Sequence, residues 1–120
     1  MLTLDEAEKI ADREFGDVVT TCVRIGHKTR SHLKDGSFVD LYLSSVIPGR
    51  FGIHWERRQT NAGILRYDNT PNTKWKDVRG FPFHVHRSKY ANVVPSEFSE
   101  DIKLAFREFM GVARNEISKH

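Results

Sequence analysis

Residues 37–68 read SFVDLYLSSVIPGRFGIHWERRQTNAGILRYD, and this stretch decides the fold. Apolar and polar side chains alternate along Ser37–Val46, which is typical of a β-strand with one buried face. Pro48 and Gly49 end this pattern, and Phe51–Arg58 follows as the next strand. A turn at residues 60–63 then separates that strand from another at Ile64–Asp68. Such short connections favour antiparallel pairing between strands that are neighbours along the chain.

Further strands and two helices flank this stretch. Val18–Ile25 and Phe81–Ser88 have the composition of strands, and the polar residues 26–36 connect the first of them to the stretch at 37–68. Thr3-Leu4-Asp5-Glu6 fits a capping box that begins the first helix, and Ser96 or Ser99 is the expected cap of the second. Each helix carries an apolar stripe at helical spacing. The sequence therefore predicts an α+β fold, with an antiparallel sheet of about five strands packed against N-terminal and C-terminal helices in a single domain, residues 1–120.

The composition limits the classes of protein to which the chain can belong. The chain has 120 residues, of which 38% are hydrophobic and 29% charged, so it can build one core. Cys22 is the only cysteine, which rules out an internal disulfide and a multi-cysteine zinc site. The acidic N-terminus does not resemble a signal peptide, and no stretch approaches the ~20 apolar residues of a membrane helix. We expect a cytoplasmic protein that does not contact membranes.

Two strands carry the candidate site. Residues two apart on a strand share a face, so Arg66 and Asp68 point one way while Tyr67 points the other. By the same rule His84 and His86 share a face. A face with a guanidinium, a carboxylate and two imidazoles would be costly to bury without partners. We therefore expect either a solvated face or a polar cleft.

Three interpretations of this face remain open. In the first, the site is free of metal and cofactor and acts on a phosphodiester: Arg66 holds the phosphate, Asp68 orients a histidine, and His84 and His86 transfer protons. In the second, Asp68, His84 and His86 bind a metal ion. In the third, the residues form an ordinary ion pair and a solvated strand face.

Two stretches of sequence at this face resemble the TumE family, the toxin half of a bacterial and archaeal toxin–antitoxin pair. They are Leu65-Arg66-Tyr67-Asp68-Asn69-Thr70-Pro71 and Phe81-Pro82-Phe83-His84-Val85-His86, and the resemblance covers roughly residues 35–90. The family typically has Tyr-Asp-Asn followed soon by Pro, and later Phe-Pro-His-His-Lys-His. Here Phe83 replaces the first histidine of that motif, Val85 replaces the lysine, and Asn72 stands where the family often has histidine.

The resemblance implies a toxin with a cognate antitoxin, often one with a helix-turn-helix. RNA is then a plausible target by analogy with other small toxins, which makes a ribonuclease-like activity at His84, His86, Asp68 and Arg66 the leading hypothesis. The residues expected to bind the substrate are Tyr67, Asn69, Lys74, Arg79, Arg87 and Lys89. The alternatives are a non-catalytic module that binds a protein partner through the same face, and a small metal-binding domain. A homodimer is compatible with each of these functions.

Overall fold

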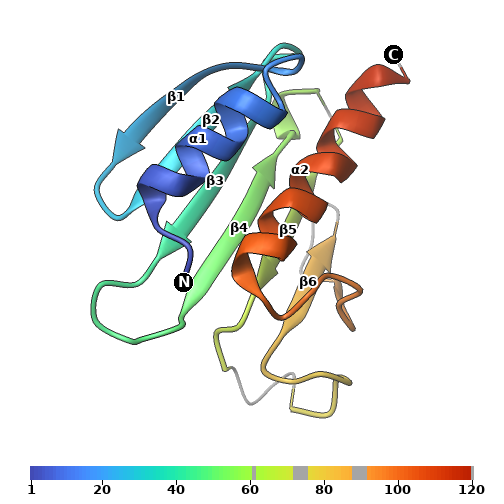
Figure 1. Ribbon diagram of the computed structural model, residues 1–120. Coiled ribbons are helices and arrows are strands. Elements are labelled where there is room, and N and C mark those ends of the chain that lie inside the picture. The colour runs from blue at the N-terminus through green and yellow to red at the C-terminus, as the bar shows by residue number, and fades with distance from the viewer. Residues whose placement is uncertain (61, 72–75, 88–91, 120) are drawn as a thin grey trace.

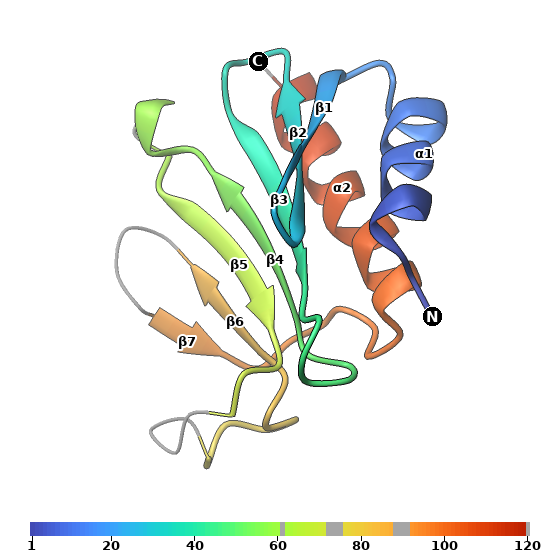
Figure 2. The ribbon, with the colours of Figure 1, turned by 90° about the vertical axis from the view of Figure 1, so that its left-hand side faces the viewer.

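The computed structural model describes residues 1–60, 62–71, 76–87 and 92–119. It consists of one antiparallel sheet with two helices packed against the same face (Figure 1). Turned by a quarter, the molecule shows both helices on one side of the sheet, while no α-helix of the described residues covers the other side (Figure 2). We call this uncovered side the open face. No helix in the described part of the chain is long and apolar enough to cross a membrane.

The sheet has seven strands in the order in which they occur along the chain. They are β1 (Val19–Ile25), β2 (Lys28–Leu33), β3 (Phe38–Leu43), β4 (Phe51–Glu56), β5 (Ile64–Asp68), β6 (His84–Arg87) and β7 (Asn92–Val94). Every pair of neighbours is antiparallel, as the short connections predicted. The α+β class and the two flanking helices are confirmed, but the expectation of about five strands was too low because it omitted β2 and the short β7.

Strand β2 was missed because its buried side chains are mostly polar. Thr29, Ser31 and Leu33 are buried and alternate with partly exposed residues. The Thr29 hydroxyl donates a hydrogen bond to Glu8 Oε2 at 2.8 Å, and Ser31 Oγ lies 3.6 Å from Cys22 Sγ. Small hydroxyl side chains that find partners can occupy a covered position on a strand without apolar residues. The apolar–polar alternation that marks β3 is therefore absent from the sequence of β2.

Helix α1 (Leu4–Glu14) begins at the predicted capping box. Thr3 Oγ1 accepts a hydrogen bond from the Glu6 amide at 3.1 Å, and Glu6 Oε1 accepts one from the Thr3 amide at 3.2 Å. Helix α2 (Ile102–Ser118) begins later than expected, because its cap is Asp101 and neither Ser96 nor Ser99. Asp101 Oδ1 accepts hydrogen bonds from the amides of Lys103 and Leu104. Ser99 instead bonds the amide of Asp101 through its hydroxyl.

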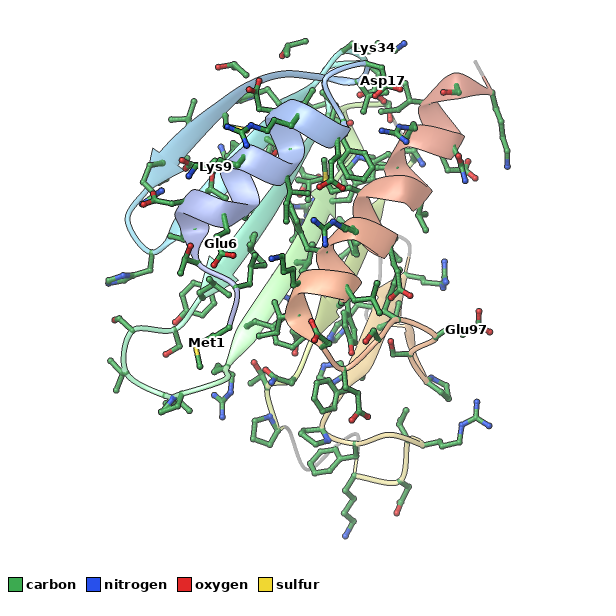
Figure 3. The ribbon with its side chains drawn as sticks, viewed as in Figure 1. Met1, Glu6, Lys9, Asp17, Lys34 and Glu97 are labelled. Carbon is green, nitrogen blue, oxygen red and sulfur yellow. The ribbon has the colours of Figure 1, made fainter. Side chains whose placement is uncertain are left out.

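The core lies between the helices and the sheet. The sheet contributes the apolar side chains of alternate positions, and α2 contributes Phe106, Phe109 and Met110. Ion pairs also join the helices: Lys103 contacts Glu6 at 3.4 Å and Arg107 contacts Glu14 at 2.9 Å. Figure 3 shows Glu6 and Lys9 on α1, and Asp17 and Lys34 together at the end of the molecule where α1 leads into the sheet. With one face covered in this way, the positions that alternate with these core residues are directed to the open face.

Candidate functional site

The open face carries a row of ionisable side chains that crosses five strands. The strand register places Arg30 opposite Asp40, Asp40 opposite His54, His54 opposite Arg66, and Arg66 opposite His86. In the next row Asp68 lies opposite His84 on one side and Gly52 on the other. The prediction that Arg66, Asp68, His84 and His86 share one face is confirmed in its geometry. We call these four residues the Asp68 cluster.

Asp68 is the centre of the cluster, and its side chain is only 4% exposed. Its Oδ2 accepts a hydrogen bond from Arg66 Nε at 2.8 Å, and its Oδ1 accepts one from the Thr70 amide at 3.0 Å. His84 Nε2 lies 3.1 Å from Oδ1, and His86 Nε2 lies 3.7 Å from Oδ2. A single buried carboxylate therefore organises a guanidinium and two imidazoles. Burial without these partners would be costly.

The two histidines differ in their surroundings. The His84 side chain is 3% exposed, and its Nδ1 lies 2.7 Å from the carbonyl oxygen of Pro82. The His86 side chain is 17% exposed. Burial lowers the pKa of His86 below its usual value and outweighs the opposing effect of the Asp68 carboxylate. His86 is therefore the more accessible of the two imidazoles, whereas His84 is buried and both its ring nitrogens have neighbours.

Arg66 reaches the cluster because Gly52 has no side chain. A Cβ built on Gly52 would lie 2.5 Å from Arg66 Nη2, so the guanidinium occupies the space where another residue's side chain would begin. Gly52 is buried and lies between Tyr42 and Asp68 in the register. Sequence analysis did not single out Gly52, although an isolated glycine inside a strand often marks a place where another group approaches the backbone closely.

A shallow groove of about 470 Å³ extends from Arg66 across the open face to β2. Most of its charged side chains are already paired. Asp40 accepts hydrogen bonds from Lys28 and Arg30. Burial alone would raise the pKa of Asp40, but these two cations outweigh it and lower the pKa. Similarly, hydrogen bonds from Arg58 lower the pKa of Glu56 to about 2.

The expected substrate-binding residues are scattered. Asn69 is committed to the backbone, since its Oδ1 accepts from the Phe51 amide and its Nδ2 donates to the Gly49 carbonyl. Arg87 belongs to the helix-facing side of β6 and lines a pocket there with Trp55 and Leu65, away from the cluster. Arg79 is exposed in the segment before β6. Lys74 and Lys89 lie outside the described residues, as does Asn72.

Tyr67, one of the residues expected to bind the substrate, does not reach the open face. Its side chain is fully buried on the helix-facing side of β5, and its hydroxyl donates a hydrogen bond to the Ser99 carbonyl at 2.9 Å. Trp55 is also buried and donates from Nε1 to Ser37 Oγ. Tyr67 instead connects the sheet to the segment that leads into α2, and burial raises its pKa to about 12.

This role of Tyr67 gives a testable expectation. Tyr67→Phe removes one hydrogen bond and leaves the aromatic core intact, so it should lower the free energy of unfolding by about 1 kcal/mol. The geometry of the Asp68 cluster should not change, because the hydroxyl does not face the open side. Denaturant unfolding measures the first effect, and the NMR signals of His84 and His86 report the second. Altered histidine signals with unchanged stability would contradict this assignment.

Comparison with known families identifies the chain. A family model described as Toxin TumE matches residues 2–117. The chain belongs to the TumE toxin family. The match extends well beyond residues 35–90, on which the resemblance first rested, and includes both helices of this TumE toxin. No curated protein and no solved structure matches it. Membership implies that an antitoxin is its partner.

Proposed function

We propose that this TumE toxin acts on RNA, and that the phosphodiester is held and cleaved at the Asp68 cluster. One observation carries the proposal: Asp68 gathers Arg66, His84 and His86 at one place on the open face. Fold alone does not determine what a protein does, so the argument rests on this site.

The cluster has the groups that phosphodiester cleavage requires. Arg66 is fixed to Asp68 through Nε, and its terminal nitrogens lie beside Gly52 at the edge of the groove. A guanidinium in this position can pair with a phosphate and stabilise the charge that develops during cleavage. The imidazoles and the carboxylate can move protons or hold a metal ion. RNA is the target by analogy with other small toxins, and the toxin would then act in the cytoplasm.

Three basic residues of β1 and β2 are already paired within the fold. Arg24 pairs with Asp5 and Glu8, and Lys28 and Arg30 pair with Asp40. The proposal therefore places the substrate's phosphate at Arg66 and makes no use of these three residues. The antitoxin, of the helix-turn-helix class by family resemblance, would neutralise the toxin in the cell. A homodimer is compatible with this arrangement.

The test uses His86, the more exposed imidazole. Expression of the wild-type chain without its antitoxin should arrest growth, and the purified protein should cleave RNA in a salt-dependent manner. His86→Ala should reduce cleavage at least ~100-fold and abolish growth arrest, because one member of the site is lost. His32→Ala is the matched control, since His32 lies on β2, three strands away from the nearer strand of the cluster, β5.

Two outcomes would contradict the proposal. Growth arrest that persists in His86→Ala would show that the activity does not depend on the Asp68 cluster. Growth arrest by a protein that binds RNA without cleaving it, or that binds only another protein, would favour the binding module over the ribonuclease.

A further inference from the structure

Two acceptor atoms of the Asp68 cluster, one on His84 and one on Asp68, lie so close together that a proton or a metal ion must lie between them. The Pro82 carbonyl oxygen can only accept a hydrogen bond, so His84 Nδ1 carries the proton. In the neutral ring His84 Nε2 then has a lone pair, and it lies 3.1 Å from Asp68 Oδ1, which also carries lone pairs. Both side chains are almost fully buried, so water does not separate the two acceptors. Either a proton between the two atoms or a metal ion must join them.

The position of His86 helps to decide between a proton and a metal ion. Its Nε2 is directed at the same carboxylate, but the 3.7 Å to Asp68 Oδ2 is too long for a hydrogen bond. Zinc binds nitrogen and oxygen at about 2.0–2.2 Å, so two ligand atoms on a tetrahedral ion lie about 3.3 Å apart. The ligand atoms of Asp68, His84 and His86 all lie within 4.8 Å of one another. A proton on His84 accounts for one of these contacts, whereas a metal ion accounts for the convergence of all three.

The surroundings of these atoms have the features of a metal site. Metal-binding histidines usually donate their other ring N–H to a carbonyl or carboxylate, as His84 does to Pro82. A ligating carboxylate is usually held by hydrogen bonds, as Asp68 is by Arg66 Nε and the Thr70 amide. These partners fix the direction of both groups before any ion binds.

We propose that Asp68, His84 and His86 bind one divalent transition-metal ion of the Zn²⁺ type. Two imidazoles and a carboxylate suit such ions, whereas Mg²⁺ prefers ligand sets made of oxygen. Three protein ligands leave a coordination position vacant, and the partial exposure of His86 places it towards the open face. A water molecule or a phosphate oxygen would bind there, beside the Arg66 guanidinium. Metal binding itself is independent of the proposed function, while the phosphate ligand rests on it.

The experiment titrates the full-length, chelator-treated protein with Zn²⁺, with Co²⁺ as a coloured probe and with Mg²⁺ as a comparator. The wild type should bind one equivalent of Zn²⁺ and should give visible Co²⁺ absorption, and Mg²⁺ should not compete. His84→Ala and His86→Ala should each weaken Zn²⁺ binding at least ~100-fold. His54→Ala is the control on the neighbouring strand. His54 lies on the open face, but its Nε2 contacts Glu56 and not Asp68.

The outcomes separate this proposal from the proposed function. No stoichiometric uptake by the wild type, or equal affinity in His86→Ala, would overturn the metal site and leave a buried hydrogen bond between His84 and Asp68. If His84→Ala does not fold, His86→Ala decides, because His86 is only partly buried. Loss of zinc in His86→Ala with unchanged growth arrest would support the metal site and contradict the proposed function. Loss of growth arrest in His86→Ala, when the wild type binds no zinc, would support the proposed function and contradict the metal site.

Discussion

Replacing Asp68 with asparagine is expected to abolish growth arrest and to lower the free energy of unfolding by about 2 kcal/mol. The asparagine oxygen can still accept from the Thr70 amide, but its NH₂ group then takes the place of Oδ2 and faces the Arg66 N–H and His86. Two donors would meet where a carboxylate now accepts, in a position only 4% exposed. Arg66 is one-third exposed, which keeps the cost below that of breaking a fully buried ion pair.

Asp40 provides the matched control, because it is a second buried carboxylate on the same face. Asp40 has two cationic partners, Lys28 and Arg30, and no histidine. Asp40→Asn should cost about 1 kcal/mol of stability and leave growth arrest intact. The lowered pKa of Asp40 means that its carboxylate stabilises the fold above the ordinary pKa of an aspartate, and that this stability is lost as the pH falls. The stability difference between wild type and Asp40→Asn should therefore shrink below about pH 4.

Denaturant unfolding at pH 7 and pH 3, with growth assays of both variants, tests this pair of substitutions. Growth arrest that persists in Asp68→Asn would exclude Asp68 from the activity. Equal loss of activity in both variants would show that general destabilisation, and not the cluster, is responsible.

Gly52→Ala is expected to reduce activity about 100-fold while leaving the fold stable. The backbone of Gly52 does not have a positive φ, so alanine fits the strand. The new Cβ would lie 2.5 Å from Arg66 Nη2, which is the end of a flexible side chain and can move aside. The guanidinium then loses its position beside Asp68. The melting temperature should stay within a few degrees of the wild type, because alanine also restricts the unfolded chain more than glycine does.

A double-mutant cycle provides the decisive measurement for Gly52. Arg66→Ala alone should reduce activity by a similar factor, and adding Gly52→Ala to it should have no further effect, because the displaced group is already absent. If the activity losses of the two single variants multiply in the double variant, Gly52 affects activity independently of Arg66. Gly111 of α2 offers a control: a Cβ there meets nothing within 4 Å, so Gly111→Ala should keep full activity.

Side-chain alternation predicted the candidate face, but not the environment of each residue on it. The spacing of two between Arg66 and Asp68, and between His84 and His86, was enough to place each pair on one face of its strand. The short turns then made these strands neighbours. The same alternation placed Tyr67 on the opposite face, but a tyrosine is compatible with either core or surface. Tyr67 is buried because α2 covers that face, which alternation along the strand does not reveal.

The features that sequence analysis missed depend on contacts between distant segments. Asp40 pairs with Lys28 and Arg30 because β2 lies beside β3, and β2 was not predicted. The role of Gly52 depends on how the Arg66 side chain crosses to the next strand. The carbonyl of Pro82 is a backbone group that no residue type reveals. These contacts determine which charged side chains are already paired and which histidine is accessible from the open face.

The sequential order of the strands has a consequence for how the toxin is made. Because each strand pairs only with its neighbours along the chain, the sheet can assemble progressively while translation proceeds. The aromatic side chains of α2 that complete the core come from residues 106 and 109, near the end of the chain. Until the ribosome has delivered them, the apolar side of the nascent sheet is only partly shielded. The sheet therefore acquires its full apolar cover only after α2 has been synthesised.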